Sequence, residues 1–145
     1  MPSIILILII GLIAGLAVGL QAPMASLIGT HLGFLESAFI VHLVGALVAL
    51  ILLIAMGGGN LGSWRDVPWY VYGAGGLGVL VISAVSFLIP RAGVATTFVI
   101  IVAGQLLIAA FLDHYGLLSA QVREFDLSRL VGLLVVFGGI WISVR

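Results

Sequence analysis

The sequence predicts an all-α membrane protein with five transmembrane helices in each chain. The hydrophobic fraction is 63%, and charged residues make up only 7% of the chain. The mean hydropathy is +1.43, which is typical of proteins that lie in a bilayer. Five separate stretches are long and apolar enough to span it, at roughly residues 3–28, 36–56, 67–88, 93–112 and 129–144.

Turn-forming residues separate these stretches. Glycines at 29 and 33, three glycines at 57–59, and the segment 90–93 with its proline mark the first three connections. The fourth connection, 113–128, is the only long polar segment. The first apolar run is too long for a signal peptide and lacks a charged start, so we expect a retained span. Residues 1–145 are therefore expected to form a single transmembrane domain.

The basic residues give almost no preference for one orientation in the membrane. The chain has no lysine, and five spans would place Arg65, Arg123 and Arg129 on the N-terminal side, with Arg91 and Arg145 opposite. Lys and Arg normally collect on the cytoplasmic side and fix the orientation. Since three against two is a weak bias, we expect insertion in both orientations and an antiparallel homodimer of ten helices.

Composition also argues against several classes of function. The absence of cysteine excludes disulfides and thiolate metal sites. The formal net charge is zero, which argues against a nucleic-acid partner. His31, His42 and His114 are too scattered for a metal site, and no catalytic triad or phosphate-binding loop is evident. We therefore expect neither a metal nor a cofactor, and no enzyme activity.

One face of the first span consists of small residues. At 100° per residue, Gly11, Gly15 and Gly19 lie on one stripe, and bulky Ile and Leu side chains fill the opposite arc. Small residues let helices approach closely in membranes, while bulky side chains face lipid. We expect these three glycines, together with Gly132 in the last span, to pack helices against one another.

Five polar side chains within the spans are predicted to bind the solute: Gln21, His42, Ser83, Ser86 and Gln105. A buried amide is costly unless it is hydrogen-bonded, so each Gln either contacts a ligand or bonds another helix. His42 shares its face with small residues and is expected to face another helix. It is either a neutral histidine bonded across helices or a proton or ligand site. Ser83 and Ser86 share a face that we expect to point inward.

Two further groups mark the membrane boundaries. Pro68 followed by Trp69 and Tyr70 predicts an interfacial aromatic belt at the start of the third span. Asp113 and His114 end the fourth span, where they either cap and solvate the helix end or handle protons.

Short motifs spread over essentially the whole chain have a spacing that is specific as a set. They are Gly19-Leu20-Gln21, Pro68-Trp69-Tyr70, Pro90-Arg91-Ala92-Gly93, Ala103-Gly104-Gln105-Leu106 leading to Asp113-His114-Tyr115-Gly116-Leu117, and Arg129 followed by Gly132. Together they resemble the signature of the YdcZ-type family, a half-length branch of the drug/metabolite transporter superfamily. The last three spans also resemble the small multidrug resistance proteins, which work as antiparallel dimers.

The resemblance implies a bacterial inner-membrane transporter or exporter without an agreed substrate. Family members occur singly, as paired genes or as fused chains, so a half-length paralogue is the alternative partner. The chain has Ala25 where the family usually has Asn, and Val41-His42 where it usually has Ser-Phe. It also lacks the first-span Glu of the small multidrug resistance proteins, so their proton-coupled cation export is not carried over.

The expected function is movement of a small organic solute by alternating access in the inverted dimer, with membrane lipid as the surroundings. The alternative is a non-transporting accessory membrane subunit or one half of a heteromeric transporter. Gln21 and Gln105 favour transport, because a purely structural bundle could carry leucine there at a lower desolvation cost.

Overall fold

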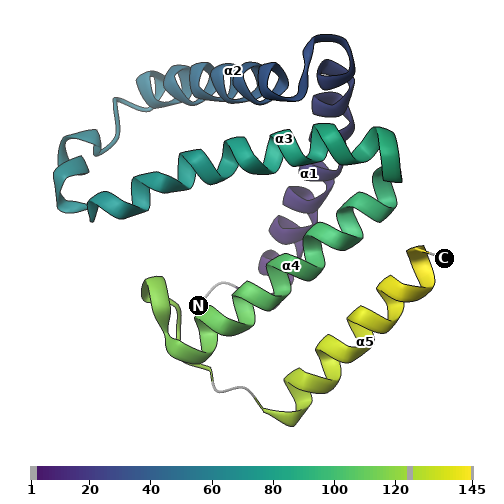
Figure 1. The fold of residues 1–145 in the computed structure, drawn as a ribbon. Coiled ribbons are helices and arrows are strands. Elements are labelled where there is room, and N and C mark those ends of the chain that lie inside the picture. The colour runs from purple at the N-terminus through teal and green to yellow at the C-terminus, as the bar shows by residue number, and fades with distance from the viewer. Residues whose placement is uncertain (1–2, 124–125, 145) are drawn as a thin grey trace. The chain divides into compact units, whose positions relative to one another are not determined.

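A computed structural model describes residues 3–123 and 126–144, and this part of the chain is helical without any strand (Figure 1). The α-helices are α1 (Ile4–Leu32), α2 (Phe34–Ala55), α3 (Ala74–Ala92), α4 (Val94–Tyr115) and α5 (Leu127–Val144). The predicted all-α class is confirmed.

Four helical segments are long and apolar enough to cross a membrane. They are α1, α2, α4, and α3 together with the turn that precedes it from Trp69. The apolar helix α5 is shorter, so a fifth span remains a prediction. The described residues thus support a multi-pass membrane protein with four candidate spans and one further apolar helix.

The connection between α1 and α2 and the connection between α3 and α4 are shorter than predicted. Only Gly33, with φ of +116°, separates α1 from α2, so Gly29 lies inside α1. Likewise only Gly93, with φ of +80°, separates α3 from α4, and Pro90 lies inside α3. Both junctions need a positive φ that residues with a Cβ rarely adopt. The helices α1 and α3 therefore extend four residues beyond the predicted ends of the first and third spans.

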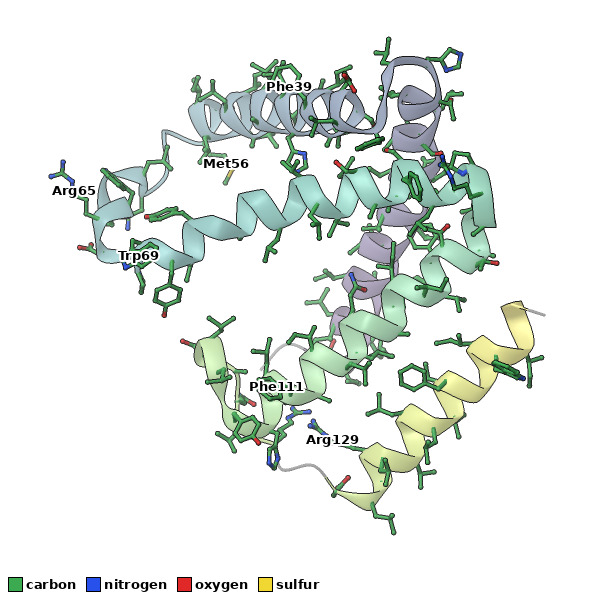
Figure 2. The ribbon with its side chains drawn as sticks, viewed as in Figure 1. Phe39, Met56, Arg65, Trp69, Phe111 and Arg129 are labelled. Carbon is green, nitrogen blue, oxygen red and sulfur yellow. The ribbon has the colours of Figure 1, made fainter. Side chains whose placement is uncertain are left out.

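The α-helix of the third span begins later than the predicted start of that span at residue 67. Short 3₁₀ turns occupy Leu61–Asp66 and Trp69–Gly73, and α3 starts at Ala74. Pro68 and the cluster of glycines that follows it have low helix propensity, which accounts for the delay. Trp69 is 84% exposed in this segment (Figure 2), as a side chain at a lipid–water boundary would be, although the aromatic belt itself remains a prediction.

The chain divides into two compact units, Met1–Arg91 and Ala92–Arg145. The first unit holds α1, α2 and nearly all of α3, and the second holds α4 and α5. Within the first unit, the buried positions are almost all small residues, which allow the three helices to approach closely. They are Ala22, Ala25, Ser26, Ser37, Ala38, Val85 and Ser86.

Candidate functional site

Buried hydroxyls join the three helices of the first unit. Ser37 Oγ donates a hydrogen bond of 2.6 Å to the backbone carbonyl of Ala25. Ser86 Oγ lies 3.2 Å from the same carbonyl and 3.1 Å from Ser37 Oγ. Each hydroxyl has one proton, so Ser86 donates to one of these oxygens at a time. We refer to Ala25, Ser37 and Ser86 as the hydroxyl cluster, and it fixes α1, α2 and α3 to one another.

A glycine allows α3 to come this close to α1. A Cβ placed on Gly29 would lie 2.7 Å from the Cβ of Ser86, which is closer than two carbon atoms can pack. Gly29 therefore serves as a contact surface inside α1. The absence of its side chain lets Ser86 reach the Ala25 carbonyl.

A groove of about 540 Å³ lies between the same three helices. Its lining residues are Gln21 from α1, Val41, His42, Gly45, Ala46 and Ala49 from α2, and Gly78, Val81 and Ile82 from α3. Among the described residues that line it, only Gln21 and His42 have polar side chains. We call it the polar groove, and it brings together two of the five predicted solute-binding residues.

The hydrogen bond of His42 defines the state of its ring. Nδ1 lies 2.8 Å from the carbonyl oxygen of Ala38, one turn earlier in α2. A carbonyl only accepts, so Nδ1 carries the proton and Nε2 of the neutral ring is an acceptor. Nε2 lies against Gly78, where a Cβ would be 2.6 Å away. Nδ1 is therefore bonded within α2, and both readings of this residue, a bond across helices and a proton or ligand site, remain predictions.

The polar groove lies well inside the apolar spans. At about 1.5 Å per residue, His42 is about 12 Å along α2 from Phe34, and Gln21 is about 17 Å along α1 from Leu32. The hydrocarbon core of a bilayer is about 30 Å thick, so both residues would lie near its middle in spans that begin at this turn. Polar groups at this depth are expensive unless they serve a function or are hydrogen-bonded.

The other predicted solute-binding residues lie elsewhere. Ser86 is 4% exposed and belongs to the hydroxyl cluster. Ser83 lines a different groove beside Phe34 and Phe87, and its buried hydroxyl makes no hydrogen bond with a described residue. Gln105 is exposed on α4, in the second unit. A pairing of Gln105 with Gln21 therefore remains a prediction.

A larger groove of about 690 Å³ lies near the turn between α1 and α2. Its walls are apolar, with Phe39 on α2 among them (Figure 2), and its one charged group is the carboxylate of Glu36. Glu36 is exposed and sits in the first turn of α2, at the end of a span. This position fits the solvated carboxylate expected near a membrane surface.

In the second unit, Asp113 joins α4 to the start of α5. Arg129 Nη2 lies 3.2 Å from Asp113 Oδ2, and Nη1 donates to the carbonyl of Arg123 at 3.2 Å. Figure 2 shows Arg129 reaching toward the end of α4 that carries Phe111. Asp126 Oδ1 accepts the backbone N–H of Arg129 at 2.8 Å and caps α5. Asp113 therefore stabilises a helix connection, which favours the structural reading over a proton-handling pair.

Sequence reasoning missed Ser37 in this region and did not single out Gly78. Ser37 lies beside Ala38 on a helix with several small residues, and a hydroxyl inside such a span is a signal for a bond between helices. Gly78 is one of several glycines in its segment, and no pattern distinguishes it from the others. Its role depends on the position of the His42 ring.

The family model described as "Putative inner membrane exporter, YdcZ" matches residues 6–142, nearly the whole chain. The chain belongs to the YdcZ family of the drug/metabolite transporter superfamily. No curated protein and no solved structure matches it. As a YdcZ-family protein, it is a multi-pass protein of the inner membrane, and the family description together with the apolar helices supports a membrane transporter.

Proposed function

We propose that this YdcZ-family protein exports a small organic solute as an antiparallel homodimer. The observation that carries the proposal is the polar groove. Gln21 and His42 line an open groove of about 540 Å³ at mid-membrane depth, where hydrogen-bonding groups are costly without a function. A solute that binds there would satisfy both side chains.

The stripe of small residues on α1 supports association with a second chain. A Cβ added at Gly11, Gly15 or Gly19 would meet no atom within 4 Å, and the same holds for Gly132 on α5. These glycines are therefore not used for packing within the described chain. Small residues on a helix surface allow a second helix to approach closely, and we place the crossing of two α1 helices at Gly15.

The arginines support an inverted arrangement of the two chains. The count of three against two leaves the orientation almost undetermined, so both orientations are available for pairing. Many transporters consist of two inverted halves that rock around a site near the middle of the bilayer. Two inverted copies of this chain supply such halves, and an exchange of conformation between them would open the site to the opposite side.

Orientation in cells tests the dimer. C-terminal fusions to a reporter active only in the cytoplasm, and separately to one active only outside it, should both give signal. A signal from one reporter alone would contradict the inverted homodimer and make a paralogue of opposite orientation the required partner.

Transport is tested with purified protein. Small neutral and zwitterionic solutes are first screened for thermal stabilisation of the protein, and vesicle uptake of the stabilising solutes is then measured. Gln21→Ala and Gln105→Ala are expected to lose solute binding while the dimer remains folded. Vesicles that take up no stabilising solute faster than protein-free vesicles would refute export.

A further inference from the structure

We propose that the polar groove selects uncharged solutes that carry an N–H or O–H donor, and that His42 Nε2 is the acceptor that recognises this donor. The inference rests on the proposed function in one respect, that this groove is the solute site. It assigns the chemistry of the solute, which neither the family nor the composition provides.

The hydrogen bond to Ala38 fixes the tautomer of His42. Its Nδ1–H is directed to the Ala38 carbonyl at 2.8 Å, so the proton is held on the side of the ring that faces its own helix. Nε2 therefore presents a lone pair, and it makes no hydrogen bond with a described residue. The lone pair of a neutral imidazole needs a donor, and a solute with an N–H or O–H group provides one.

The described lining of the groove carries no acidic or basic side chain besides His42. Apart from Gln21 and His42, the lining consists of glycine, alanine, valine and isoleucine. Neither α1 nor α3 contributes a titratable side chain to the groove, and on α2 the nearest one, Glu36, lines the other groove. A charged solute would lose its hydration in the spans without an opposite charge to compensate. The groove therefore favours uncharged molecules.

The remaining titratable groups of the first unit lie away from the groove. His31 bonds the Leu27 carbonyl near the end of α1, and Arg91 lies over the Phe87 ring at the end of α3. The others belong to the segment with the two 3₁₀ turns, between α2 and α3. Among the described residues of this unit, His42 is the one titratable side chain that lines the groove.

Gly78 leaves room for the acceptor beside α3. A Cβ at this position would lie 2.6 Å from Nε2, so Gly78→Ala forces the imidazole ring to move. Gly75 lies three residues earlier in α3, and a Cβ there would meet nothing within 4 Å. Gly75→Ala is therefore a matched control that changes the same helix by the same atom without touching His42.

His42→Gln gives the proposal a second test. Its side-chain amide retains an oxygen acceptor in place of the imidazole ring, so the variant should still bind a solute that only donates.

The test uses indole as the probe, because its N–H is a donor only, and N-methylindole as the analogue without the donor. The full-length protein, with isotope-labelled histidine, is placed in lipid nanodiscs and its ring nitrogens are followed by NMR. The chain has three histidines, and the signal lost in His42→Gln assigns His42. We expect an unprotonated Nε2 whose resonance shifts saturably with indole, and binding of N-methylindole that is at least about fivefold weaker. Gly78→Ala should abolish this discrimination, and Gly75→Ala should retain it.

Several results would overturn the proposal. One is equal binding of indole and N-methylindole, and another is an Nε2 resonance that shifts no more than indole dissolved in the lipid would cause. A proton on Nε2 at neutral pH, or a Gly78→Ala protein that discriminates the two indoles as Gly75→Ala does, would also overturn it. The NMR measurement does not depend on transport. Solute uptake without indole discrimination would refute this inference alone, and indole discrimination in a protein with a single orientation would refute the inverted homodimer alone.

Discussion

Replacing Gly29 with alanine should force α3 away from α1 and weaken the hydroxyl cluster. The added Cβ would lie 2.7 Å from Ser86 Cβ and 3.2 Å from Ser86 Oγ. Non-bonded carbon atoms pack at about 3.5–4.0 Å, so the helices must separate by about 1 Å. Because Ser86 Oγ is already 3.2 Å from the Ala25 carbonyl, such a shift breaks that hydrogen bond.

The size of the effect follows from three contributions to the free energy of unfolding. Overpacking a close contact costs about 1–3 kcal/mol. A lost hydrogen bond between membrane helices costs about 0.6–1 kcal/mol. The higher helix propensity of alanine returns about 0.5–1 kcal/mol. We therefore expect Gly29→Ala to lower the free energy of unfolding by about 1–3 kcal/mol.

Unfolding by SDS titration in mixed micelles, at a fixed protein concentration, measures this change. Gly75→Ala is the control, because it has the same propensity gain and nothing within 4 Å of the new Cβ. Ser86→Gly removes the clashing Cβ, so the double variant should be more stable than the sum of the single effects by about 1 kcal/mol or more. If the two effects add, or if Gly29→Ala is as stable as Gly75→Ala, the close contact between α1 and α3 is wrong.

Three further predictions concern the dimer, the second unit and orientation. Gly15→Leu should leave the helical content unchanged, because a Cβ added at residue 15 meets no atom within 4 Å in the chain. Its bulky side chain should block the approach of a second helix, so native mass spectrometry should detect monomer in place of dimer; an intact dimer would contradict this. Arg129→Ala breaks the ion pair with Asp113. The Arg129 side chain is 29% exposed and the Asp113 side chain 37% exposed, so a double-mutant cycle of Arg129→Ala with Asp113→Asn should give a coupling free energy below about 1 kcal/mol. A coupling well above that would show a buried pair. Arg91→Gln changes the arginine count to three against one and should shift the mixture measured by C-terminal reporters toward one orientation, whereas an unchanged mixture would argue against charge control.

Composition and hydropathy were sufficient to predict the all-helical membrane class, because in a bilayer few other structures provide hydrogen bonds for the backbone N–H and C=O groups. The helix ends were harder to predict. Gly29 and Gly33 look alike in the sequence, yet only Gly33 adopts the positive φ that ends α1. Gly29 remains helical, and α3 packs against it through Ser86, a residue far along the chain.

The polar groove was predictable in part. Gln21 and His42 stood out individually because polar groups within spans are costly. That they line one groove depends on how α1 and α2 pack, and helical periodicity within each span does not determine this. The acceptor state of His42 depends on its bond to Ala38, and the role of Gly78 depends on the ring position that results.

The central claim, an antiparallel dimer that crosses at Gly15, is tested most directly by disulfide cross-linking. The chain has no cysteine, so introduced cysteines report without background. Gly11 and Gly19 each lie four residues from Gly15, or about 6 Å along the helix axis. In an antiparallel pair Gly11 faces Gly19 of the second copy, while identical positions are about 12 Å apart along the axis, beyond the reach of a disulfide.

Differently tagged Gly11→Cys and Gly19→Cys chains are co-expressed in the membrane and oxidised, and each variant is also oxidised alone. The account predicts a strong cross-link between the two variants and little cross-linking of either variant with itself. Strong self-linking of Gly11→Cys and of Gly19→Cys, with little linking between the two variants, would show a parallel pair and contradict the inverted dimer.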